Sequence, residues 1–93
     1  MLADREPVTA YVAVGANLGD ARQTVLGSLS ALARLPGTVC SGRSRLYRTA
    51  PFEAQGPDFI NAVVRLETRL SAPELLDALQ GLENQAGRLR PYQ

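Results

Sequence analysis

The stretch FINAVVRLET, Phe59–Thr68, alternates between two kinds of residue. Successive side chains of a β-strand point to opposite faces of the sheet, so this alternation predicts a strand with two different faces. One face is entirely apolar and belongs in a core; it carries Ile60, Ala62, Val64 and Leu66. The other face is mixed; it carries Phe59, Asn61, Val63, Arg65 and Glu67. Such a pair of faces is typical of an antiparallel sheet that is covered on one side only.

An amphipathic helix is predicted on each side of this strand. Before it, Asp20 can cap a helix of about residues 21–35, with Gln23 in the capping-box position and apolar residues at helical spacing. After it, Ser71 and Glu74 form a second capping box, and a leucine stripe follows. Both helices therefore have a local start signal and one apolar side.

Two further strands complete the order β-α-β-β-α. Val8–Gly15 is apolar and rich in β-branched residues, and Thr38–Thr49 alternates more weakly, before a Pro- and Gly-containing loop at Ala50–Asp58. This order is five of the six elements of the ferredoxin-like split βαβ, an α+β fold with both helices on one face of an antiparallel sheet. We expect the last strand to be missing, which would leave Val8–Val14 as an unpaired apolar edge.

Length and composition fit one small domain. The chain has 93 residues, and we expect one incomplete domain over residues 1–93 with a flexible N-terminus at 1–7. A net charge of +1 argues against nucleic-acid or membrane partners bound by bulk electrostatics. Histidine is absent, which excludes imidazole bases and histidine metal ligands. The lone Cys40 and the lack of a signal peptide predict a cytoplasmic location.

The mixed face of Phe59–Thr68 suggests a ligand site. Phe59 and Asn61 are two residues apart, so an aromatic ring and a side-chain amide lie side by side. The ring can stack on a flat, nitrogen-rich heterocycle, while the amide and the backbone of Thr49–Phe52 bind the edge of that heterocycle. The alternative is an aromatic residue at the start of a strand beside a polar residue near a turn, and by pattern alone this is the commoner case.

A second candidate site follows the second helix. Gln80 and Glu83 are neighbours on one helix face, and Arg88 and Arg90 come just after it. Each arginine offers a planar donor group to a phosphate. A solvated helix face with cations near the helix C-terminus would give the same pattern. All ten basic residues are arginine, which suits phosphate binding but is also what codon bias would produce. The nine acidic residues include no D-x-D or D-x-x-D, so no local magnesium site is predicted.

Three motifs follow one another along the chain: AYVAVGANLGD, YRTAPFEAQGPDFINAVVRLET and LENQAGRLRPY. With these motifs in this order, the chain from Ala10 onward resembles the N-terminal part of the hydroxymethyl-dihydropterin pyrophosphokinases of folate biosynthesis. The resemblance implies transfer of a pyrophosphoryl group from ATP to the pterin hydroxymethyl group. It implies a pterin site made of Gly15, Thr49, Ala50, Pro51, Phe52, Phe59 and Asn61. It implies an ATP site made of Gln80, Glu83, Arg88 and Arg90, with Arg88 and Arg90 also acting in catalysis.

The chain departs from the family pattern in two places. Ala50 replaces a frequent proline, a modest change in a loop whose backbone is used. The family continues with a stretch resembling R-T-L-D-L-D, whose aspartates hold Mg²⁺ with ATP and which forms the last strand; no such metal ligands are present here. We therefore expect this chain alone to be impaired in the reaction.

Other functions and other assembly states stay open at this point. The first alternative is a non-catalytic pterin-binding or interaction module of the same family, and the second is a ferredoxin-like RNA-binding domain. We expect a monomer, with dimerisation or a strand swap through the unpaired first strand as the alternative.

Overall fold

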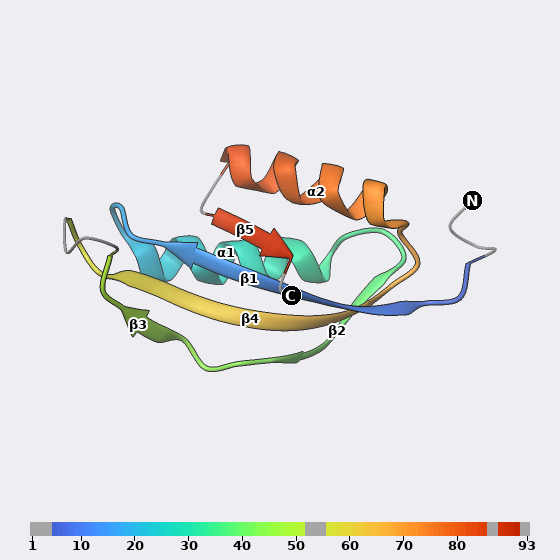
Figure 1. The fold of residues 1–93 in the computed structure, drawn as a ribbon, viewed down its shortest axis with the longest axis horizontal. Coiled ribbons are helices and arrows are strands. Elements are labelled where there is room, and N and C mark those ends of the chain that lie inside the picture. Colours follow the sequence, from blue (N-terminus) through green and yellow to red (C-terminus); the bar gives the residue numbers. More distant parts are fainter. Residues whose placement is uncertain (1–4, 52–55, 86–87, 92–93) are drawn as a thin grey trace.

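The computed structural model describes residues 5–51, 56–85 and 88–91 (Figure 1). Its elements are β1 (Val8–Ala16), α1 (Ala21–Ala33), β2 (Thr38–Arg43), β3 (Tyr47–Thr49), β4 (Phe59–Thr68), α2 (Ala72–Gln85) and β5 (Arg88–Pro91). The sheet has the order β2-β4-β1-β5, and β3 pairs with β4 beyond the end of β2. All of the pairings are antiparallel, which confirms the predicted α+β class. No described helix is long and apolar enough to cross a bilayer.

The core lies between one face of the sheet and the two helices. Val12 and Val14 of β1 and Val64 and Leu66 of β4 are at most 2% exposed, and they form one cluster with residues of both helices. The helix residues of that cluster are Val25, Leu29, Leu32, Leu75 and Leu79. The apolar face predicted for Phe59–Thr68 is therefore the face that packs in the core, and the mixed face is left without helices.

Both helices begin where their capping residues predict. The Asp20 carboxylate accepts a hydrogen bond from the Gln23 backbone N–H at 3.2 Å. At α2 the capping box is reciprocal: the Ser71 N–H donates to Glu74 Oε1 at 2.7 Å, and the Glu74 N–H donates to Ser71 Oγ at 3.3 Å. These bonds satisfy backbone donors that have no partner within the helix.

The expectation of a missing last strand is wrong. Residues Arg88–Pro91 form β5, which pairs with Val12–Gly15 of β1 (Figure 1). The predicted free edge is therefore occupied along this part of β1. A four-residue strand has too few residues to show an alternating pattern, and its pairing depends on the tertiary fold.

The segment Thr38–Thr49 is also not a single strand. It divides into β2 and β3, with Ser44–Leu46 between them, and the register against β4 shifts between Cys40 and Gly42. A bulge of this kind bends a strand and increases its twist. β3 pairs only with the first residues of β4, from Phe59 to Asn61.

Candidate functional site

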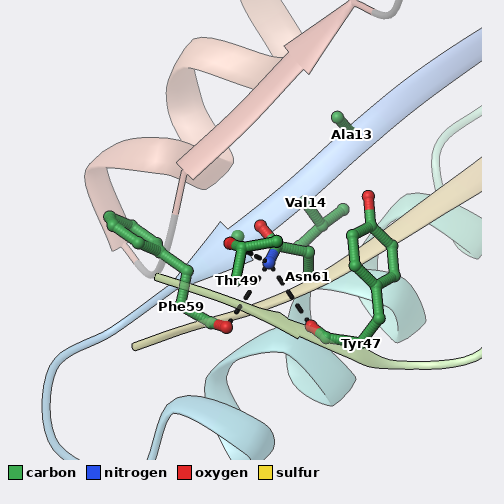
Figure 2. A pocket seen from close by; sticks show the side chains of 7 residues that line it. Ala13, Val14, Tyr47, Thr49, Phe59 and Asn61 are labelled. Atoms are coloured by element: carbon green, nitrogen blue, oxygen red, sulfur yellow. Dashed lines mark hydrogen bonds between the residues drawn. The ribbon is translucent and has the colours of Figure 1, made fainter. Parts of the chain in front are cut away.

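A shallow pocket of about 240 Å³ lies on the face of the sheet that the helices leave open. Its walls come from three neighbouring strands, because Asn61 of β4 pairs with Gly15 of β1 on one side and with Tyr47 of β3 on the other. The pocket is lined by Ala13, Val14, Gly15, Tyr47, Thr49, Phe59 and Asn61 (Figure 2). Cross-strand partners share a face of the sheet, so this register alone brings the polar and aromatic groups together.

The Asn61 amide is held by hydrogen bonds within the sheet. Its Nδ2 donates to Thr49 Oγ1 at 2.9 Å, to the Tyr47 carbonyl at 3.3 Å and to the Phe59 carbonyl at 3.4 Å (Figure 2). Three acceptors around one end of the amide assign that end as the nitrogen. Among the described hydrogen bonds, none is accepted by Asn61 Oδ1. The part of the amide left for a ligand is thus an acceptor whose position is already fixed.

Gly15 lies directly across from that acceptor. A Cβ atom at position 15 would be 3.1 Å from Asn61 Oδ1 and 3.9 Å from Phe59 Cδ1. The first distance is tighter than an ordinary carbon–oxygen contact, so a side chain here would push the amide aside. Glycine at this position therefore keeps both the amide geometry and the open floor of the pocket.

Phe59 and Asn61 lie on the open face together, as the alternation predicts. The Phe59 ring lies at one end of the pocket, and Tyr47 lies at the other end with Asn61 and Thr49 between them (Figure 2). Ala50 and Pro51 follow β3 and are not lining residues, whereas Phe52 lies outside the described residues.

Tyr47 is a lining residue that the sequence interpretation missed. Its position two residues before Thr49 was visible in the sequence, but its place beside Asn61 depends on the register of β3 against β4. Sequence alternation assigns a side chain to a face and leaves its cross-strand neighbour undetermined.

The second predicted cluster is divided between two elements. Gln80 and Glu83 lie on α2, which packs on the helix-covered side through Leu75 and Leu79, and they do not line the pocket. The backbone of β5 places Arg88 opposite Gly15 and Arg90 opposite Ala13. The two arginine positions are therefore adjacent to the strand that forms the pocket floor, and the two α2 positions are not part of that floor.

A network of polar side chains lies on the open face of the sheet, farther along the strands from the pocket. The Glu67 carboxylate accepts hydrogen bonds from Thr9 Oγ1 at 2.7 Å and from Ser41 Oγ at 2.8 Å, and Arg65 Nε lies 4.0 Å from it. The Thr9 and Ser41 hydroxyl groups lower the pKa of Glu67 below its ordinary value of 4.5, and the Arg65 charge adds a smaller lowering. This network links β1, β2 and β4.

A magnesium site is not formed by the described residues. No group of three or more cysteine, aspartate or glutamate side chains comes together within the ranges that the structure covers. The described part of the chain therefore offers no cluster of carboxylate oxygens, the usual protein ligands of Mg²⁺.

A family model for 7,8-dihydro-6-hydroxymethylpterin-pyrophosphokinase (HPPK) matches residues 11–93 of this chain. The chain belongs to the HPPK family. The matched range contains every residue of the pocket described above. The helix-free pocket, the glycine on its floor and the β5 arginine positions are thus features of an HPPK chain.

Similar proteins carry the same family name. The chain is 40% identical over 84 residues to the 2-amino-4-hydroxy-6-hydroxymethyldihydropteridine pyrophosphokinase of Haemophilus influenzae, which covers 89% of this chain and 52% of the relative. It is 43% identical over 81 residues to the enzyme of that name from Pseudomonas aeruginosa, covering 86% of this chain and 50% of the relative. It is 35% identical to the enzyme of that name from Pseudomonas putida, and the match covers 89% of this chain and 69% of the relative. This HPPK chain thus spans about half the length of the first two relatives.

Proposed function

We propose that this chain binds a 6-hydroxymethyl dihydropterin on the open face of its sheet, in an enzyme that transfers a pyrophosphoryl group from ATP to the hydroxymethyl oxygen. The observation that carries the proposal is that Gly15, Asn61 and Tyr47 are cross-strand partners on neighbouring strands, and that Phe59 lines the same pocket. Family membership supports the choice of a pterin among flat heterocycles. The names of the similar proteins support the reaction.

The pterin is proposed to lie over Gly15 with one ring face against Phe59. Asn61 Oδ1 then accepts a hydrogen bond from an N–H group on the pterin edge, which carries several such donors. Because the amide nitrogen is already bonded to Thr49 Oγ1, the acceptor does not have to be oriented when the ligand arrives. The remaining proposed pterin contacts come from the last residue of β3, Thr49, and from the three residues that follow it, Ala50, Pro51 and Phe52.

ATP is proposed to bind on the β5 side of the pocket. Arg88 and Arg90 would contact its phosphates and stabilise the charge that develops during transfer, and Gln80 and Glu83 would lie near the nucleotide. The pterin hydroxymethyl oxygen gives up its proton to solvent and attacks the β-phosphorus; the bond from that phosphorus to the oxygen shared with the α-phosphorus breaks, and AMP leaves with that oxygen. The backbone pairing of Arg88 and Arg90 with Gly15 and Ala13 supports this arrangement.

Three further features belong to this proposal. Mg²⁺ would accompany ATP, and the described residues do not form its site. The chain is proposed to act as a monomer, and the pairing of β5 with part of the β1 edge, the edge named for the alternative strand swap, supports this. A cytoplasmic location agrees with a single half-buried cysteine.

The test combines binding with turnover on the 93-residue chain. Pterins are fluorescent and the chain has no tryptophan, so 6-hydroxymethylpterin binding can be followed by fluorescence without a competing indole signal. AMP release from Mg-ATP, with and without hydroxymethyl dihydropterin, measures the reaction. The proposal predicts saturable binding that Asn61→Ala weakens about tenfold or more, because the fixed acceptor is lost.

A matched control is available on the same face. Val39 of β2 is 64% exposed and lies away from the pocket, so Val39→Thr should leave pterin binding unchanged. Saturable binding without pterin-dependent AMP would assign to this chain pterin binding alone. Absence of pterin binding to a folded chain would contradict the proposal.

A further inference from the structure

Tyr47 is an aromatic lining residue to which neither the resemblance nor the reaction assigns a role. It occupies the first position of β3, and its carbonyl accepts a hydrogen bond from Asn61 Nδ2 at 3.3 Å. Leu46 before it packs against the core, so the alternation of the strand places Tyr47 on the open face. The backbone that carries the Tyr47 side chain is therefore fixed by the same amide that forms the pocket.

The Tyr47 side chain reaches across the sheet. Tyr47 belongs to β3 and Ala13 to β1, with β4 between them, yet both line the same pocket. In Figure 2 the phenol ring lies at the opposite end of the pocket from the Phe59 ring, with Thr49 and Asn61 between the two. The two rings thus bound the length of the site, one at each end.

The Tyr47 hydroxyl remains available for a ligand. Tyr47 is 46% exposed, and within the described part of the chain its hydroxyl makes no hydrogen bond. A tyrosine with an apolar ring against a pocket wall and a solvated hydroxyl combines ring contact with one polar contact. Phe59 has no polar side-chain atom, so of the two rings Tyr47 is the one that can bind a polar substituent of the heterocycle.

We propose that Tyr47 determines specificity for the ring substituent: its ring closes the end of the pocket opposite Phe59, and its hydroxyl hydrogen-bonds the oxygen of the hydroxymethyl group. The inference rests on the proposed function, since it assumes a pterin in this pocket. It orients that pterin with its hydroxymethyl arm toward Tyr47 and Ala13. Arg90 is opposite Ala13 in the register, so the arm then lies on the side where the phosphates are proposed to bind.

Two ligands that differ by one oxygen test this contact. Fluorescence titration of the 93-residue chain with 6-hydroxymethylpterin and with 6-methylpterin measures how much the hydroxyl of the substituent contributes to affinity. We expect the wild-type chain to prefer 6-hydroxymethylpterin, roughly three- to tenfold, as for one net hydrogen bond. Tyr47→Phe removes only the phenol oxygen, and it should abolish this preference while leaving the affinity for 6-methylpterin unchanged.

The other outcomes separate this inference from the proposed function. If Tyr47→Phe retains the wild-type preference, or weakens the binding of both pterins equally, the proposed Tyr47 contact is wrong. If Asn61→Ala weakens the binding of both pterins in the same experiment, the pterin site still stands. If the folded wild-type chain binds neither ligand, both proposals fail together. Tyr47→Leu tests the ring itself: it should weaken both pterins, and unchanged affinity for both would exclude Tyr47 as a wall of the site. Far-ultraviolet circular dichroism of each variant checks that the substitution in β3 has not unfolded the sheet.

Discussion

At the scale of single residues, Asn61 shows how an unfavourable strand residue is accommodated. Asparagine is depleted in strands, yet its nitrogen here reaches three acceptors supplied by β3 and by its own strand. The sequence predicts that this amide faces the open side, because that follows from the period of two. It does not predict which amide atom remains for a ligand, because that depends on where β3 lies.

Gly15→Ala tests the geometry between β1 and β4. A Cβ 3.1 Å from Asn61 Oδ1 should displace the amide and reduce 6-hydroxymethylpterin affinity several-fold. Gly27→Ala is the matched control, since a Cβ there meets nothing within 4 Å and alanine is favoured in α1 by about 0.5–1 kcal/mol. Parallel fluorescence titrations and urea denaturation measure the two effects. Equal pterin affinity in wild type and Gly15→Ala would contradict the assigned role of this glycine.

Glu67 should give the fold a measurable dependence on acid. Its folded-state pKa is lowered, first by Thr9 and then by Ser41, so the carboxylate contributes stability above its ordinary pKa of 4.5. That contribution is lost as the pH falls through the lowered pKa. Urea midpoints of wild type and Glu67→Gln should therefore differ by a constant, small amount near pH 7 and converge below about pH 4.5. A difference that stays constant down to pH 3 would show that the carboxylate charge plays no part.

At the scale of elements, local signals predicted the helices better than the strands. The starts of α1 and α2 follow from Asp20 and Ser71, which bond to backbone donors within three residues. The division of Thr38–Thr49 and the pairing of Arg88–Pro91 were missed, because a bulge and a four-residue strand are decided by contacts with distant segments. The pocket could therefore not be predicted in full from the sequence, because β3 forms one of its three walls.

The capping box of α2 permits a test of one element alone. Ser71→Ala removes the acceptor for the Glu74 N–H and should reduce the free energy of unfolding by about 1 kcal/mol. Ser30→Ala, at an exposed position within α1, should be neutral or slightly stabilising because alanine is the better helix former. Urea denaturation of both variants measures this difference. Similar losses in the two variants would mean that the cap contributes nothing specific.

At the scale of the whole molecule, the fold separates stability from binding. Both helices pack on one face of the sheet and bury its apolar residues, so the opposite face can carry an amide, a glycine and two aromatic rings. This division was predictable, because it follows from the alternation in Phe59–Thr68. The arrangement of β3, β4 and β1 around one pocket was not, because it is set by register across three strands.

The most direct test of the account is a ¹⁵N NMR titration of the 93-residue chain with 6-hydroxymethylpterin. A pterin bound on the open face should cause saturable shifts of the backbone amides of Gly15, Tyr47, Thr49, Phe59 and Asn61. The amides of α1 and those around Glu67, which lie outside the pocket, should stay unchanged. Saturable shifts confined to the helices, or none in a folded chain at millimolar pterin, would contradict the claim that the open face of the sheet is the pterin site.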